Sequence, residues 1–147
     1  MNMGWDIDKR KRKLRKFLRR VNVRPKGVKT LKGDCSTRCL AYCLDEDYLV
    51  VRDEQHLLAE SKHEQWNGAE FWDTMLRKRG WKRIYLAHPT VRYKIAEATK
   101  DLPHPLATSS SGHVCPTFEG KIIDLRESQL GRVDYVVCCK EDYKLAK

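Results

Sequence analysis

The sequence has no long apolar run. A helix that crosses a bilayer needs roughly 18 to 20 consecutive apolar residues, and charged side chains interrupt every apolar stretch of these 147 residues well before that length. The N-terminus is basic, but the apolar segment of a secretory signal does not follow it. We therefore expect no transmembrane segment and no export, so that the protein acts in the cytoplasm.

The six cysteines lack the spacing of a common metal-binding motif, because no two of them are separated by two residues. Six cysteines in a small exported protein would suggest disulfides. Without an export signal we expect reduced thiols instead. Cys138 and Cys139 are adjacent, which also argues against an ordered set of disulfides. One or more thiols are then available for chemistry.

Glycine and proline are sparse, with eight and five residues, while hydrophobic residues make up 41% of the chain. This composition and length are typical of one globular domain. Helical patterns come first and strand patterns last, so we predict an α+β fold in which N-terminal helices pack on a small antiparallel sheet. The predicted helices cover residues 6–21, 35–44, 53–63, 68–79 and 90–99, and the predicted strands cover residues 82–87, 106–109, 113–118, 121–125 and 133–138.

The last two-thirds of the chain contain a predicted hairpin whose strands are joined by Glu119-Gly120, a pair typical of a tight two-residue turn. A two-residue turn fixes the register of the two strands. In that register His113 and Asp124 are diagonal neighbours on the same face, within reach of each other. Pro116 lies inside the first strand, which favours an edge position or a bulge there because proline donates no hydrogen bond.

Cys35 follows Gly33-Asp34 at the start of a predicted helix. The free amide groups and the dipole of a helix N-terminus stabilise a thiolate and lower the pKa of the thiol. A thiolate is the nucleophile that thioester chemistry requires. We therefore interpret Cys35 as a nucleophile, His113 as its general base and Asp124 as the carboxylate that orients the imidazole.

Three strings, Gly-Asp-Cys-x-x-Arg at 33–38, Gly-His-Val at 112–114 and Gly-Lys-Ile-x-Asp at 120–124, together resemble the papain-like cysteine peptidase superfamily. The likeness is greatest to small members from bacteria and phages, and it covers residues 33–137. It implies a papain-like domain, taken as residues 23–147, that hydrolyses a peptide, isopeptide or related amide bond in a peptide or protein substrate. The implied mechanism passes through a thioester and needs no cofactor, and the implied location is the bacterial cytoplasm.

The sequence lacks one feature of papain-like enzymes, a Gln or Asn several residues before the nucleophile that helps bind the oxyanion. The backbone N–H of Cys35 supplies one donor. Thr30 and Asn22 are the side chains that we consider for a second. Asp34 and Arg38 flank the nucleophile, and we expect Arg38 to neutralise Asp34 or a substrate carboxylate.

Positive charge is concentrated near the N-terminus, since residues 5–21 hold nine Lys or Arg and two Asp, a net +7 of the chain's +10. Apolar residues recur there at helical spacing, so we predict a basic amphipathic helix within residues 1–22. Such a helix suits nucleic-acid phosphates or an anionic membrane surface. The alternative to an enzyme is therefore a non-catalytic protein that binds nucleic acid or a partner. The candidate nucleic-acid-binding residues are Lys9, Arg10, Lys11, Arg12, Lys13, Arg15, Lys16, Arg19 and Arg20.

Zinc is a further alternative, because Cys35, Cys39, His113 and Cys115 carry the donor atoms that zinc prefers. Their spacing does not match a known zinc-ligand pattern, so we expect a hydrolase without a bound metal. Cys39 is instead expected to be a buried core residue, as is Cys43 one turn later.

Overall fold

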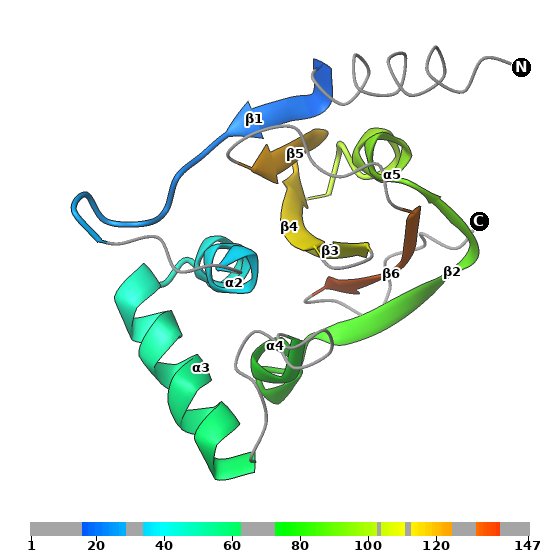
Figure 1. Cartoon of the computed structure of the whole chain (residues 1–147). Coiled ribbons are helices and arrows are strands. Elements are labelled where there is room, and N and C mark those ends of the chain that lie inside the picture. Colours follow the sequence, from blue (N-terminus) through cyan, green and yellow to red (C-terminus); the bar gives the residue numbers. More distant parts are fainter. Residues whose placement is uncertain are drawn as a thin grey trace, which may run out of the picture.

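The structure is a computed structural model, and it describes residues 16–28, 34–62, 73–102, 104–110, 113–124 and 132–138. These residues form an α+β fold in which helices lie on both sides of a small sheet (Figure 1). The elements are β1 (Leu18–Arg20), α2 (Cys35–Leu44), α3 (Tyr48–Lys62), α4 (Thr74–Lys78), β2 (Lys82–Val91), α5 (Arg92–Ala98), β3 (Leu106–Ser110), β4 (His113–Phe118), β5 (Lys121–Asp124) and β6 (Arg132–Cys138).

The sheet has the strand order β1-β5-β4-β3-β6-β2. Neighbouring strands are antiparallel except for β1 and β5, which are parallel and pair Leu18 with Ile122 and Arg20 with Asp124. The prediction of a purely antiparallel sheet is therefore wrong at this edge. β1 extends the sheet beside the strand that carries Asp124.

Alternate residues of β4 face two different helices. Val114 belongs to the buried cluster that contains Cys39 and Leu40 of α2. The next residue, Cys115, belongs to a second cluster with Ala96 of α5. Since successive strand residues point to opposite faces, α2 and α5 pack against opposite sides of β4 (Figure 1). β4 thus lies between the helix that begins with Cys35 and the helix that begins with Arg92.

The predicted N-terminal helix is wrong over its last residues, because residues 18–20 form strand β1 instead. Their backbone pairs with the open edge of β5, and this pairing overrides the local preference of Lys, Arg and Leu for helix. Residues 16 and 17 are helical, as predicted, Val21 is not, and residues 1–15 lie outside the described residues.

Most other predicted elements are present with shifted bounds. The third helix begins at Tyr48, earlier than the predicted residue 53, and β2 extends to Val91 rather than to residue 87. Gly80 adopts a positive φ of 86° just after α4, the left-handed conformation that glycine favours beyond a helix end. The predicted start of that helix near residue 68 lies outside the described residues.

Candidate active site

Cys35 is the first residue of α2, and the residue before it does not cap the helix. Asp34 occupies the N-cap position but makes no side-chain cap hydrogen bond. Its carboxylate instead accepts hydrogen bonds from Arg24 Nε at 3.1 Å, Arg38 Nε at 3.1 Å and the Tyr48 hydroxyl at 2.9 Å. The Asp34 side chain therefore leaves the amide groups of the first turn to act on the Cys35 sulfur or on a bound anion.

A buried glutamine fixes the first turn of α2 against α3. Gln55 has no exposed surface. Its Oε1 accepts a hydrogen bond from the Thr37 hydroxyl at 2.6 Å, and its Nε2 donates to Ser36 Oγ at 3.2 Å. Ser36 and Thr37 directly follow Cys35, so these bonds hold the nucleophile's turn in one position.

The hairpin that carries the other two candidate residues has the predicted two-residue turn. Glu119 and Gly120 both have positive φ values, 52° and 75°, as a type I′ turn requires. The pairing of β4 with β5 is recorded only at Thr117–Ile122 and Phe118–Lys121. Beyond Thr117 and Ile122, toward His113 and Asp124, no further pair joins the two strands.

Pro116 lies where that pairing ends. Of the two predicted alternatives, the edge position is wrong, because β4 is an interior strand between β3 and β5, and the pairing of β4 with β3 shows no bulge at Pro116. Pro116 pairs in register with Ala107 of β3. Since proline has no N–H to donate, β4 offers no amide donor at this position, and β5 continues on its other side with β1.

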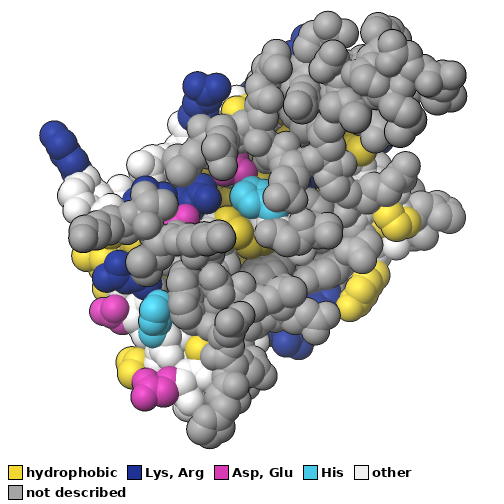
Figure 2. Space-filling view, viewed as in Figure 1, with side chains coloured by type: hydrophobic (Ala, Val, Ile, Leu, Met, Phe, Trp, Pro, Cys, Tyr) yellow, Lys and Arg dark blue, Asp and Glu magenta, His cyan; other side chains and the backbone are white. Residues whose placement is uncertain are grey.

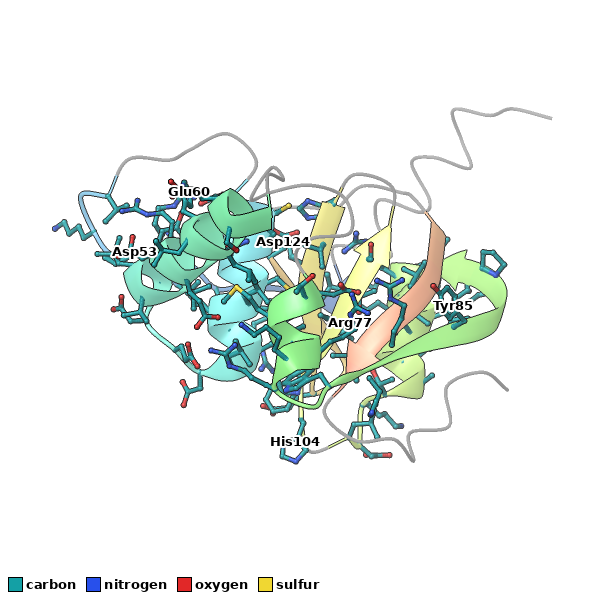
Figure 3. The ribbon with its side chains drawn as sticks, turned by 90° about the horizontal axis from the view of Figure 1, so that it is seen from below. Asp53, Glu60, Arg77, Tyr85, His104 and Asp124 are labelled. Carbon is teal, nitrogen blue, oxygen red and sulfur yellow. The ribbon has the colours of Figure 1, made fainter. Side chains whose placement is uncertain are left out.

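The side chains of His113 and Asp124 lie next to each other at the ends of β4 and β5 away from the turn. His113 Nε2 lies 2.7 Å from Asp124 Oδ2, and the Asp124 side chain is only 4% exposed. The other carboxylate oxygen, Oδ1, accepts a hydrogen bond from Arg38 at 3.2 Å. Asp124 therefore has one oxygen on the imidazole and one on a guanidinium, which fixes its orientation. Figure 3 shows Asp124 in the interior beside α2, whereas Asp53 and Glu60 lie on the outer helix α3.

The Cys35 thiol and the His113 imidazole are close enough that each shifts the pKa of the other. Burial alone raises the pKa of Cys35, but the hydrogen bond to His113, the backbone N–H of Val114 and the nearby positive charges outweigh it, so this pKa lies below its ordinary value. Burial lowers the pKa of His113, yet its hydrogen bonds to Asp124 and Cys35 raise it above the ordinary value. Because Nε2 binds Asp124, Nδ1 is the nitrogen left for the thiol. The two shifts favour a thiolate beside an imidazolium.

A small pocket lies beside Cys35, between α2 and the ends of β4 and β5. Its lining includes Cys35, Arg38, Tyr42, Val114, Ile123 and Asp124. The pocket thus lies between the helical part of the fold and the sheet, and the Cys35 thiol and the Asp124 carboxylate both line it.

The candidate oxyanion and substrate residues have different positions from those expected. Arg38 bridges Asp34 and Asp124, so it holds the site together and its guanidinium is already engaged by two carboxylates. Asn22 is exposed, and its Oδ1 accepts the backbone N–H of Arg24 at 3.0 Å. Thr30 lies outside the described residues. The second oxyanion donor thus stays a prediction.

Sequence reasoning missed Arg92, which reaches β4 from α5. Its side chain is 1% exposed, and it donates hydrogen bonds to the backbone oxygen of His113 and to Cys115 Sγ. The chain contains many arginines, and Arg92 lies in a short predicted helix. No local pattern therefore distinguishes it from the others. Only the packing of α5 against β4 reveals its partners.

One group of side chains in the described part of the chain has the donors and spacing for a metal ion. His113, Cys115 and Asp124 offer ligand atoms within 4.8 Å of one another. A divalent cation there would lie close to two positive charges, because Arg38 donates a hydrogen bond to Asp124 and Arg92 donates one to Cys115. Like charges at such distances oppose binding, so the donors suit proton transfer better than metal coordination. Cys39 is not part of this group, and burial raises its pKa well above the ordinary value.

Most of the candidate nucleic-acid-binding residues, Lys9 to Arg15, lie outside the described residues. Lys16 and Arg20 are exposed, and Arg19 pairs with Glu119 at 3.7 Å. On the face shown in Figure 2, the described Lys and Arg side chains are spread over the surface rather than gathered in one patch. These positions leave nucleic-acid binding as a prediction.

Among the described residues, no helix has the length and apolar character needed to cross a membrane. Comparison of the chain with protein-family models, with curated proteins and with solved structures finds no match. Function is therefore argued from the geometry of the site.

Proposed function

We propose that this protein is a thiol hydrolase of the papain-like type that cleaves a peptide, isopeptide or related amide bond. The observation that carries the proposal is one imidazole, His113, which lies 2.7 Å from the Asp124 carboxylate and close enough to the Cys35 thiol to lower its pKa. A nucleophile, a base and an orienting carboxylate in this order are the working parts of acyl transfer.

In the first half-reaction the Cys35 thiolate attacks the carbonyl carbon of the substrate. The carbonyl oxygen becomes an oxyanion, which the backbone N–H groups at the start of α2 stabilise. When the tetrahedral intermediate collapses, the C–N bond breaks and the His113 imidazolium gives its proton to the leaving amine. The products are a free amine and a thioester on Cys35.

In the second half-reaction a water molecule replaces the amine. Neutral His113 takes a proton from the water, which attacks the thioester carbonyl. Collapse of the second intermediate breaks the C–S bond, releases a carboxylic acid and restores the thiolate–imidazolium pair. An amine acceptor in place of water would use the same residues and give transfer instead of hydrolysis.

The position of Cys35 supports the role of nucleophile rather than that of a core cysteine. Cys39 and Cys43 follow it at one-turn intervals on α2, and both are buried. Of these three, only Cys35 is partly exposed and stands at the helix start, and its surroundings lower its pKa. A partly exposed thiolate beside a positive charge is the usual setting of a reactive cysteine.

A peptide library tests the proposal directly. The purified protein is incubated with proteome-derived peptides, and new termini are identified by mass spectrometry. We expect cleavage products from the wild type and from Cys43→Ala, a matched control on the same helix, but none from Cys35→Ala or His113→Ala. Equal products from the wild type and Cys35→Ala would contradict a Cys35 hydrolase that acts on peptides.

A further inference from the structure

Arg92 places a positive charge in the protein interior, next to the backbone of His113. It is the first residue of α5, and its side chain is among the largest that are fully buried. One guanidinium nitrogen donates to the backbone oxygen of His113 at 2.9 Å, and another donates to Cys115 Sγ. Both acceptors belong to β4, so the guanidinium spans the end of the strand that presents the imidazole.

This end of β4 has less sheet support than the rest of the strand. The recorded pairs with β5 stop at Thr117, whereas the pairs with β3 continue to His113. A strand end with a neighbour on one side is easily displaced, because half of its ladder is missing. Arg92 supplies a donor to this segment from the side opposite α2.

A buried guanidinium has a large desolvation cost unless its partners offset it. An apolar side chain of similar volume would fill the same space without that cost. Two of the acceptors of Arg92 lie on the strand of His113 and Cys115. The charge is thus placed against the strand that presents the imidazole.

The charges around His113 come from three packed elements and from its own strand. Asp124 faces it from β5, Cys35 and the charge of Arg38 from α2, Arg92 from α5, and Cys115 lies beside it on β4. Burial lowers the pKa of His113, the hydrogen bonds to Asp124 and Cys35 raise it, and the charge of Arg92 lowers it. A general acid must release its proton in each cycle, and Arg92 opposes the groups that would retain it.

We propose that Arg92 is a positioning residue for the reaction, which holds the His113 end of β4 so that the imidazole meets Cys35 and Asp124 together. The inference rests on the proposed function, because it assigns a role in the same proton transfer. It concerns a residue that touches the backbone of His113, not the substrate.

The test compares Arg92→Met, Arg92→Lys and Arg83→Met in the full-length protein. Arg83 binds the buried Asp73 outside the site, so its variant controls for the loss of a mostly buried guanidinium elsewhere in the fold. Three quantities are measured: thermal unfolding, the rate of Cys35 alkylation by iodoacetamide at pH 7, and the His113 titration by NMR. His113→Ala is included to test the proposed function itself.

We expect Arg92→Met to slow Cys35 alkylation about tenfold or more, because small displacements of a reacting group have effects of this size. The His113 titration should move to higher pH, since a nearby positive charge is lost. Arg92→Lys should return the titration toward that of the wild type while alkylation stays slow. Arg83→Met should leave both unchanged.

A folded Arg92→Met protein with the wild-type rate and titration would overturn the inference. If Arg92→Met does not fold, Arg92→Lys decides: a reduced rate supports the inference and a wild-type rate overturns it. If His113→Ala alkylates as fast as the wild type, the proposed function fails as well. If His113→Ala slows alkylation but the Arg92 variants behave as the wild type, the result supports the proposed hydrolase and contradicts the role of Arg92.

Discussion

At the residue scale, the chemistry depends on how His113 is balanced between its neighbours. Asp124 accepts one hydrogen bond from the imidazole, and Cys35 shares the other. Arg38 holds Asp124 in place through the second carboxylate oxygen. The imidazole is thus fixed by partners on two elements, and the charge of each partner changes how readily it binds a proton.

Asp124→Asn should lower the pKa of His113. The carboxylate raises that pKa through its hydrogen bond and its charge, and an amide retains a hydrogen bond but not the charge. The imidazolium should therefore lose its proton at a lower pH than in the wild type, which an NMR titration of His113 measures. An unchanged titration midpoint would mean that Asp124 does not act on His113 electrostatically.

Arg38→Met should destabilise the protein by about 3 kcal/mol, because it leaves two mostly buried carboxylates, Asp34 and Asp124, without this partner. Urea unfolding measures the loss. Arg79→Met is the matched control, since Arg79 also bridges two carboxylates, Glu46 and Glu54, but at the surface. Surface pairs contribute about 1 kcal/mol or less, so equal losses in the two variants would contradict the account.

At the element scale, two features bring the candidate residues together: the start of α2 and the β4–β5 hairpin. The helix start presents Cys35 because Asp34 turns away from the cap position toward Arg24, Arg38 and Tyr48. The hairpin presents His113 and Asp124 from adjacent strands, beyond their last pair at Thr117 and Ile122. Neither element forms a site without the other.

Gln55→Leu should destabilise the protein by about 2 kcal/mol, because it keeps the volume but leaves the buried hydroxyls of Ser36 and Thr37 without this partner. Leu57→Ala, at a position on the same helix that is 68% exposed, is the control and should change stability by about 0.5 kcal/mol or less. Thermal and urea unfolding measure both. A negligible loss in Gln55→Leu would show that Gln55 does not anchor the first turn of α2.

Local patterns predict the elements that carry the candidate site. Glu119-Gly120 indicates the two-residue turn, and this turn sets the register that places His113 near Asp124. Gly33-Asp34-Cys35 indicates a helix start, and the structure has one at Cys35. These predictions succeed because turn geometry and helix initiation depend on neighbouring residues.

The contacts across the fold could not be predicted in the same way. Arg38 lies 86 residues from Asp124, and its ion pair depends on how α2 packs against β5. Arg92 reaches β4 only because α5 covers the other face. β1 is a strand because β5 has an open edge, although Leu18, Arg19 and Arg20 favour a helix locally. Such tertiary choices leave no periodic signal in one sequence.

At the scale of the whole molecule, the described sheet has a buried centre and an exposed edge. β3 lies between β4 and β6, and its residues Leu106, Ala107 and Thr108 have no exposed surface. β1 is a short strand at the outer edge beside β5. The site lies between these regions, beyond the last paired residues of β4 and β5.

Hydrogen exchange should follow this division. Amides of β3 should exchange only when the whole protein unfolds, whereas amides of β1 should exchange faster through local opening at the edge. Native-state exchange read by mass spectrometry measures both strands in one experiment. Equal protection of β1 and β3 would show that the edge strand is part of the most stable unit.

The central claim is that His113 activates Cys35, and the rate of Cys35 alkylation by iodoacetamide across pH tests it most directly. The modified residue is located by mass spectrometry, and N-acetylcysteine serves as the reference thiol. The account predicts rapid alkylation of Cys35 below the pH at which an ordinary thiol ionises, and a loss of about tenfold or more in His113→Ala. Alkylation that follows an ordinary thiol pKa and does not change in His113→Ala would contradict it.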